Sequence, residues 1–282
     1  MTKRAYLHMW KPVSVSGVTL FRAEHIQQRF TRHSHEEYAL GVITGGVLGF
    51  DYRGKYHLAG AGEVNLVVPG EAHTGEPALG EDWSYRMFYI QPELMQAIAR
   101  QAGGDNGALP FFHAGVIQDE RLAATVIGLH TDLDEQGISA LEAQSRLIAL
   151  LATWIRRHGE NTRAATRIPG RAPDLTRVRD FLDDCWQQKP ALRQLAEMAG
   201  LSPYHLLRAF IRQYGLPPHA YLIQRQLRAA KRLLDKGLPI AEVACSCGFA
   251  DQSHLHRHFK RTWGITPGQY RNFVQESARG RR

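Results

Sequence analysis

The sequence predicts a two-domain α+β protein, with an N-terminal β-barrel and following helices, and a C-terminal all-α domain. Three observations predict this fold class. A length of 282 residues suits two domains better than one. The spacing of apolar residues changes along the chain from a period of two to a helical period. Residues 1–170 carry 16 Lys+Arg and 18 Asp+Glu, a net charge of −2, whereas residues 171–282 carry 19 and 9, a net charge of +10.

The composition excludes several classes of protein. With 44% hydrophobic and 22% charged residues, wholesale disorder is excluded. No apolar run reaches the roughly 18 uncharged residues of a membrane helix, and the basic N-terminus lacks the apolar segment of a signal peptide. Three cysteines do not make a disulfide framework, so we expect free thiols in a reducing cytoplasm. The charge balance indicates that only the C-terminal domain meets a polyanion.

The β pattern of the barrel runs from about residue 18 to residue 90. Apolar residues alternate at Tyr38, Leu40 and Val42, and the same alternation recurs over residues 64–68. Glycine-containing turn signals separate such runs at residues 45–46, 53–54 and 60–62. Several short strands at this spacing predict a small antiparallel barrel or sandwich.

Helices are expected after Pro92, where the period changes. The predicted ranges are 93–101, 119–135 and 139–158, and Asp119 and Ser139 suit the N-caps of the last two. The third helix must bury its apolar stripe on its own barrel or on a second subunit. The barrel and these helices form a predicted domain of residues 18–158, and residues 159–173 suit a linker because they are polar and contain Gly and Pro.

Histidines in the barrel resemble the split metal-binding motif of cupins. His33 and His35 stand two residues apart, and His73 follows a Pro-Gly turn. Alternate side chains of one strand share a face, so a third histidine from a neighbouring strand could complete an open metal site. The resemblance is partial, because Glu36 and Glu37 follow the second histidine almost directly. A metal site, a ligand contact and hydrogen-bonded structural histidines all stay open, whereas nothing indicates catalysis.

An internal near-repeat marks the C-terminal half. Residues 195–202 resemble residues 243–250, and residues 206–210 resemble residues 255–259. Each copy predicts a short helix, a turn at a glycine and a longer helix, which is the helix-turn-helix pattern. The two motifs cover about residues 192–213 and 240–263. Their predicted N-caps are Ser202 and Asp251, and their predicted core residues are Leu206, Phe210, Leu255 and Phe259.

A single helix is expected between the two motifs, over residues 219–236. Its 18 residues make a rod of about 27 Å at 1.5 Å per residue. Successive major-groove faces on one side of DNA lie about 34 Å apart. A rigid connector of this length would let one chain place two recognition helices in adjacent grooves.

Residues 174–273 resemble the DNA-binding domain of the AraC/XylS family of bacterial transcription regulators. The second motif, residues 240–271, has the family's Gly-Phe, Phe-Lys, Gly-x-Thr-Pro and Tyr-Arg elements in order. Residues 18–90 resemble, more loosely, the cupin-like sensory domain of this family. The resemblance implies seven helices in the DNA-binding domain, a ligand-responsive barrel and dimerisation through the helices after it. The partners implied are double-stranded DNA, a small-molecule effector, RNA polymerase and a second copy of the chain, with no membrane and no cofactor.

Two sets of site residues follow. Helix geometry together with the resemblance predicts that DNA is contacted by Tyr204, His205, Leu207, Arg208, Arg212, Gln252, Ser253, His256, Arg257 and Lys260. Arginine pairs well with guanine and glutamine with adenine. The strand pattern makes candidates for an effector pocket of Phe21, His33, His35, Tyr38, Tyr52, His73, Trp83 and Tyr85. The candidates for a metal ion are His33, His35 and His73.

The favoured interpretation is a cytoplasmic, sequence-specific DNA-binding transcription regulator whose barrel senses a small molecule. The alternative is a cupin-type metalloenzyme or metal sensor fused to a DNA-binding domain. A third interpretation keeps DNA binding and uses the barrel for dimerisation or for contact with another protein.

Overall fold

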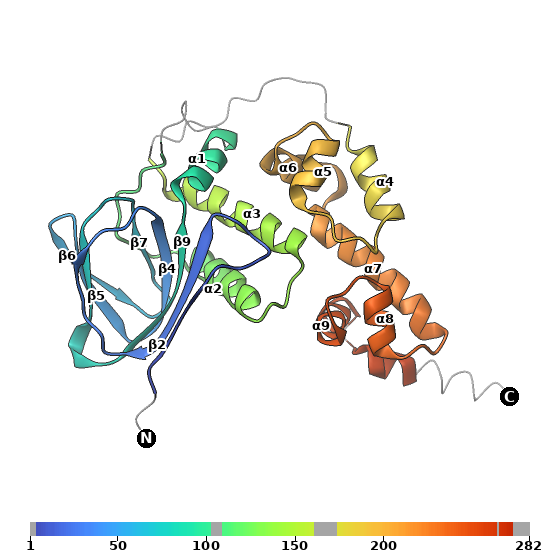
Figure 1. The fold of residues 1–282 in the computed structure, drawn as a ribbon, viewed down its shortest axis with the longest axis horizontal. Coiled ribbons are helices and arrows are strands. Elements are labelled where there is room, and N and C mark those ends of the chain that lie inside the picture. Colours follow the sequence, from blue (N-terminus) through green and yellow to red (C-terminus); the bar gives the residue numbers. More distant parts are fainter. Residues whose placement is uncertain (1–3, 103–108, 161–173, 264, 273–282) are drawn as a thin grey trace. The chain divides into compact units, whose positions relative to one another are not determined.

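The computed structural model describes residues 4–102, 109–160, 174–263 and 265–272 (Figure 1). The chain divides into two compact units, of which unit 1 comprises Met1–Glu135 with Arg146–Pro169 and unit 2 comprises Gln136–Ser145 with Gly170–Arg282. Unit 1 is rich in strands and unit 2 is helical, which confirms the predicted fold class. The predicted linker falls largely on residues 161–173, outside the described residues. Among the described helices, none is both long and apolar enough to cross a membrane.

Unit 1 contains two antiparallel sheets. The six-stranded sheet has the order β1-β2-β9-β4-β7-β10, and the four-stranded sheet has the order β3-β8-β5-β6. The strands are β1 (Tyr6–Trp10), β2 (Val18–Ile26), β3 (Phe30–His33), β4 (Tyr38–Gly45), β5 (Val47–Tyr52), β6 (Lys55–Gly60), β7 (Val64–Val67), β8 (His73–Pro77), β9 (Trp83–Ile90) and β10 (Val116–Ile117).

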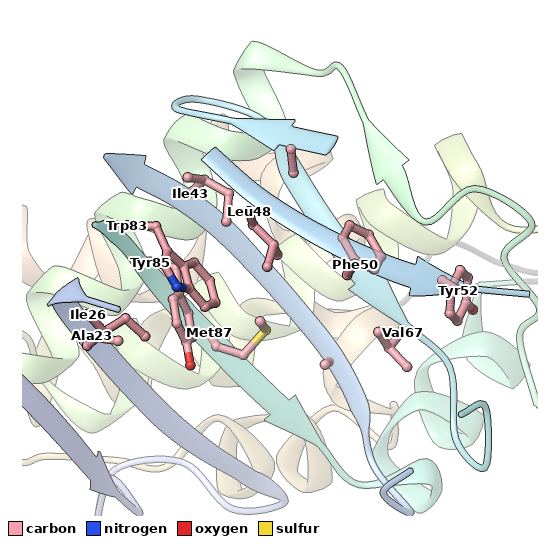
Figure 2. Close-up of a cluster of buried hydrophobic side chains, with 12 residues drawn as sticks. Ala23, Ile26, Ile43, Leu48, Phe50, Tyr52, Val67, Trp83, Tyr85 and Met87 are labelled. Carbon is pink, nitrogen blue, oxygen red and sulfur yellow. The ribbon is translucent and has the colours of Figure 1, made fainter. Parts of the chain in front are cut away.

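Strand β4 is buried on both faces, although its apolar alternation predicted one buried face. All residues from Tyr38 to Ile43 are buried. Ala39 and Ile43 belong to the apolar cluster between the sheets, which Figure 2 shows with Trp83, Tyr85 and Met87 of β9. The Tyr38 ring lies edge-on to the ring of Trp154, with centroids 6.2 Å apart. Helices therefore cover the face of β4 that the sequence left unassigned.

The three predicted helices after the barrel are present, each within a residue or so of its expected bounds. They are α1 (Pro92–Gln101), α2 (Glu120–Asp134) and α3 (Ala140–His158). Both predicted N-caps are confirmed. Asp119 Oδ1 accepts from the Leu122 amide at 3.0 Å, and Ser139 Oγ accepts from the Glu142 amide at 3.2 Å. The apolar stripe of α3 is buried within the chain itself, where Trp154 stacks on Phe112 at 4.2 Å between centroids.

Unit 2 repeats one motif on either side of a long helix. Its helices are α4 (Thr176–Asp184), α5 (Leu192–Met198), α6 (Pro203–Tyr214), α7 (Pro218–Asp235), α8 (Ile240–Ser246) and α9 (Gln252–Trp263), and residues 267–272 are also helical. In the described part of unit 2, these segments supply the seven helices that the resemblance implied. Figure 1 shows α5 and α6 near one end of α7 and α8 and α9 near the other.

The turn glycines, N-caps and core residues of the two helix-turn-helix motifs stand where the sequence predicts them. Gly200 and Gly248 turn the chain with φ of 61° and 78°, in the left-handed region that favours glycine. Ser202 Oγ accepts from the His205 amide at 3.3 Å, and Asp251 Oδ1 accepts from the His254 amide at 2.7 Å. The four predicted core residues, Leu206, Phe210, Leu255 and Phe259, are each 0% exposed.

The stability of unit 1 is expected to depend on pH through His130 of α2. This fully buried residue accepts at Nδ1 from Arg86 at 2.9 Å and donates at Nε2 to the Phe21 carbonyl at 3.1 Å. Burial and the charge of Arg86 lower the pKa of His130 to about 4. The unfolded state, with a pKa near 6.5, therefore takes up the proton first as the pH falls. Between about pH 6.5 and pH 4, this group should remove about 3 kcal/mol of unfolding free energy.

Urea unfolding of the wild type and of His130→Gln at about pH 7 and about pH 4.5 tests this expectation. The wild type should lose more unfolding free energy on acidification than the variant does. His113→Gln is the control, because the side chain of His113 is 82% exposed. Equal acid sensitivity in the wild type and in His130→Gln would contradict the expectation.

Candidate functional sites

The first recognition helix, α6, presents a basic face to solvent. His205, Arg208 and Arg212 are exposed along it. The expectation that Tyr204 and Leu207 also lie on this face is wrong, because they are only 3% and 5% exposed. Helix α6 packs against both α5 and α7, so it buries a wider arc than the stripe through Leu206 and Phe210.

The second recognition helix, α9, exposes all five of its predicted contact residues, which are Gln252, Ser253, His256, Arg257 and Lys260. In this structure Arg257 Nη2 donates a hydrogen bond to the Gly137 carbonyl at 2.7 Å, within unit 2. No Asp or Glu occurs anywhere in α6 or α9. Both helices therefore offer cations and neutral donors to a polyanion, and the carboxylate of Asp251 lies just outside α9, at its N-cap.

A cluster that the sequence did not single out lies in unit 2. Ligand atoms of Glu142, His254 and His258 all lie within 4.8 Å of one another. The Ala250 amide donates to His254 Nδ1 at 3.2 Å, so the proton of neutral His254 lies on Nε2, 3.0 Å from His258 Nε2. His254 therefore donates to His258, and its Nε2 has no lone pair for a metal ion. Burial lowers the pKa of His254 to about 4 and that of His258 to about 3, which keeps this pair neutral.

Unit 1 contains a partly open cavity of about 220 Å³ between its two sheets. Side chains from both sheets line it, and most are aromatic or apolar. The lining residues are Met9, Phe21, Phe30, His33, His35, Ala39, Leu48, Phe50, Asn65, Val67, His73, Thr74, Gly75, Trp83, Tyr85, Met87 and Tyr89. None of these residues is Asp, Glu, Lys or Arg, so the cavity has no permanently charged wall.

The structure places six of the eight predicted pocket residues along this cavity, namely Phe21, His33, His35, His73, Trp83 and Tyr85. Tyr38 and Tyr52 do not line it, which corrects the expectation. Tyr38 points to the opposite face of β4 from Ala39 and donates its hydroxyl to the Pro110 carbonyl at 2.7 Å. Tyr52 is buried in the cluster of Figure 2, and its hydroxyl accepts from the Val68 amide at 3.4 Å.

Three histidines gather at one part of the cavity. The ring centroid of His73 lies 4.4 Å from that of His33 and 5.0 Å from that of His35. His33 belongs to β3, whereas His35 follows that strand, so the two do not share a strand face as expected. The barrel histidines also do not form a group of three ligand atoms within 4.8 Å in the described part of the chain.

Backbone carbonyls fix the orientation of all three rings. The Nδ1 atoms of His33, His35 and His73 lie 2.8, 2.7 and 3.0 Å from the carbonyl oxygens of residues 31, 37 and 71. A carbonyl only accepts, so each Nδ1 carries the proton and each Nε2 keeps its lone pair. Burial lowers the pKa of His73 to about 4 and also lowers that of His35. His35 and His73 therefore offer hydrogen-bond acceptors at Nε2 near pH 7.

Sequence reasoning missed several residues of the cavity, and two signals could have found them. Extending the alternation through Trp83 and Tyr85 by period two leads to Met87 and Tyr89. Asn65 is a lone polar residue between Val64 and Leu66, in an otherwise apolar strand.

Comparisons with known proteins identify the two domains. Residues 15–151 match the family model described as the AraC-like ligand binding domain, and residues 195–272 match a helix-turn-helix domain. The chain is 30% identical over 238 residues to the uncharacterized HTH-type transcriptional regulator YbfI of Bacillus subtilis, covering 84% of this chain and 86% of YbfI. It is 33% identical over 175 residues to the transcriptional activator NphR of Rhodococcus sp, covering 61% and 49%.

Among solved structures, the chain is similar to the DNA-binding domain of AdpA, a global transcriptional factor, in complex with a target DNA. The identity is 28% and the TM-score is 0.36, and the match covers 37% of this chain and 96% of that domain.

Proposed function

Because the chain belongs to the AraC family of DNA-binding transcription regulators with a ligand-binding N-terminal domain, we propose that α6 and α9 read two successive major grooves of an operator, under control of an effector bound in the barrel cavity. The observation that carries the proposal is the duplicated helix-turn-helix. Both copies have a buried core, a capped recognition helix and an exposed face without carboxylates. The helix α7 between them has 18 residues, or about 27 Å, which suits adjacent grooves.

The exposed residues of the two helices are the proposed DNA contacts. We assign guanine contacts to Arg208 and Arg257 and an adenine contact to Gln252, because arginine pairs well with guanine and glutamine with adenine. Arg212 and Lys260 stand toward the ends of their helices, where phosphate contacts are expected. The remaining proposed contacts are His205, Ser253 and His256.

The cavity of unit 1 supports the ligand-binding half of the proposal. It lies within the segment that matches the ligand-binding family, and its lining combines apolar walls with a few polar groups, as small-molecule sites do. We assign the effector domain to residues 18–158 and the DNA-binding domain to residues 174–273. The further partners proposed are a second copy of the chain and RNA polymerase, in the cytoplasm, where bacterial DNA resides.

The alternative of a metalloenzyme or metal sensor receives no support. The relatives named above are transcription regulators, and the barrel histidines are not grouped tightly enough to match a metal-ligand set.

Selection of bound sequences from random DNA by the full-length chain tests the proposal. The expected result is a motif of two blocks whose centres lie about 10 base pairs apart. A chain that is folded but enriches no sequence would overturn the proposed function.

The histidine cluster should affect the response to effector. We expect His35→Ala and His73→Ala each to raise the effector concentration for half-maximal response about fivefold, because each removes an acceptor worth about 1 kcal/mol. An operator–reporter fusion titrated with effector measures the response. His57→Ala is a matched control, because His57 lies on β6 and does not line the cavity. An unchanged response in both variants would remove the histidines from the site.

A further inference from the structure

Two buried polar atoms on the cavity wall have no hydrogen-bond partner among the described residues. They are Asn65 Oδ1 and Trp83 Nε1, on side chains of residues that are 4% and 3% exposed. Buried polar groups are almost always paired, because an unmade hydrogen bond leaves the desolvation cost uncompensated. Both residues line the cavity. An acceptor and a donor therefore stand ready for a molecule that enters it.

The histidine cluster adds acceptors at a defined position. Each Nδ1 is occupied by a backbone carbonyl, so only the Nε2 lone pairs of His33, His35 and His73 can pair with a ligand. An acceptor cannot satisfy another acceptor, so a ligand that hydrogen-bonds to these nitrogens needs an O–H or N–H group. Ethers and ketones without such groups cannot make this contact.

The walls limit the charge and shape of the ligand. No lining residue is Asp, Glu, Lys or Arg, and burying an ion without a countercharge is strongly unfavourable. The aromatic rings of Phe21, Phe30, Phe50, Trp83, Tyr85 and Tyr89 all border the cavity. Aromatic rings pack well against flat aromatic partners. The lining thus favours an uncharged, flat molecule.

Ring contacts relate the histidine acceptors to the Trp83 donor. Alternate residues of β9 from Trp83 to Tyr89 line the cavity, and the His35 ring lies 5.4 Å from the Tyr89 ring between centroids. The Phe30 ring lies 6.4 Å from the His33 ring and 6.2 Å from the Trp83 ring. The centroids of His33 and Trp83 are therefore separated by no more than the sum of these last two distances, so one ligand can contact both residues.

We infer that the effector is an uncharged aromatic compound with a hydroxyl or N–H group directed to the histidine Nε2 atoms and Asn65, and with an acceptor directed to Trp83 Nε1. This inference rests on the proposed function, in which the cavity is the effector site. It assigns neutral phenol-like compounds to that site and excludes carboxylates and other anions.

Gly41 of β4 lies against two side chains that line the cavity, Met87 and Asn65. A Cβ at this position would lie 2.6 Å from Met87 Cε and 2.8 Å from Asn65 Oδ1. Since these two side chains line the cavity, Gly41→Ala should push them into the space the ligand needs. This variant tests occupancy of the cavity without removing a polar group.

Four naphthalene probes with the full-length chain test the inference, with affinities measured by ligand-observed NMR titration. The probe 6-methoxy-2-naphthol has a donor at one end and an acceptor at the other. It should bind about fivefold or more tightly than 2,6-dimethoxynaphthalene, which lacks the donor. It should likewise exceed 2-naphthol, which lacks the far acceptor, and 6-methoxy-2-naphthoate, which is an anion. A carboxylate that binds as tightly as the phenol, or four probes that fail to bind, would overturn the inference.

Substitutions at Trp83, Asn65 and Gly41 test whether these residues cause the preference for 6-methoxy-2-naphthol. Trp83→Phe keeps an aromatic side chain, although a smaller one, and removes the N–H, so it should abolish the advantage of 6-methoxy-2-naphthol over 2-naphthol. Asn65→Leu and Gly41→Ala should both weaken the binding of 6-methoxy-2-naphthol. Tyr56→Phe is the control, because Tyr56 is 53% exposed on β6 and does not line the cavity. Circular dichroism checks that each variant is folded, and a Trp83→Phe chain that keeps the advantage contradicts the inference.

NMR and metal titration distinguish an aromatic effector from a metal ion as the occupant of the cavity. Nitrogen-15 NMR of labelled histidines should show the Nδ1–H form for His73, with an Nε2 signal that shifts when 6-methoxy-2-naphthol is added. Tight Zn²⁺ binding that disappears in His73→Ala would instead make the occupant a metal ion and overturn the inference. DNA binding is measured separately. A folded chain that does not bind DNA would refute the proposed function. A chain that binds DNA but none of the naphthalene probes would refute only the inferred class of effector.

Discussion

Raising the NaCl concentration from 50 to 200 mM is expected to weaken DNA binding by the full-length chain by about 10³-fold or more. A chain that neutralises six to ten phosphates releases that many condensed counterions, and added salt opposes their release. The recognition helices suit such contacts, because α6 and α9 contain basic residues and no Asp or Glu. Fluorescence anisotropy with labelled operator, at several salt concentrations, measures the slope.

Single substitutions test which charged residues contribute to the salt dependence of DNA binding. Arg212→Ala, if Arg212 contacts phosphate, should weaken binding to all sequences alike and reduce the salt slope by about one. Arg179→Ala removes the same charge from α4, where Arg179 pairs with Asp180, and should leave the slope unchanged. Operator binding that is insensitive to salt would show that phosphate contacts do not supply the affinity.

Replacing Arg208 or Arg257 by Ala should cost about 1–3 kcal/mol each and relax the preference at one base position each. The two positions should lie about 10 base pairs apart, because α7 sets the spacing of the helices. The smaller effect is expected for Arg257. Its hydrogen bond to the Gly137 carbonyl must break before the guanidinium can reach a base. The cost of breaking that bond offsets part of the free energy gained from the contact with the base.

Binding-site selection with the wild type and both variants, read base by base, decides between base and phosphate contacts. Arg179→Ala again controls for the loss of one charge. Loss of preference at the same position in both variants would rule out the two-groove arrangement. Uniform weakening with a shallower salt slope would make that arginine a phosphate contact.

The helical half of the protein could be predicted closely because its signals are local. A cap, a glycine turn and a pair of core residues act within one or two helical turns, and Ser202, Gly248 and Phe259 stand as predicted. The burial of Tyr204 and Leu207 has a cause that is not local. Which arc of a helix is buried depends on how many neighbours it has, and α6 has two.

The barrel could be predicted only in outline. Alternation shows that the two faces of a strand differ, but it does not show which face is the interior. The pattern therefore predicts Tyr38 in the cavity, whereas Ala39, on the other face of the strand, lines it. Asn65 and Trp83 became informative only when the structure showed both their burial and the absence of partners for two of their atoms among the described residues.

The two turn glycines have unequal surroundings, and this sets how freely each half of the repeat can change in sequence. A Cβ on Gly200 would meet nothing within 4 Å, so Asn, which tolerates the left-handed region, could replace it at modest cost. A Cβ on Gly248 would lie 2.8 Å from Gln226 Nε2 and 3.1 Å from the Gln187 carbonyl oxygen. Gln226 is itself buried and donates to the Trp186 carbonyl at 3.0 Å. The turn of the first motif therefore tolerates substitution of its glycine. The turn of the second motif requires glycine, because Gln226, which lies outside that motif, occupies the space beside it.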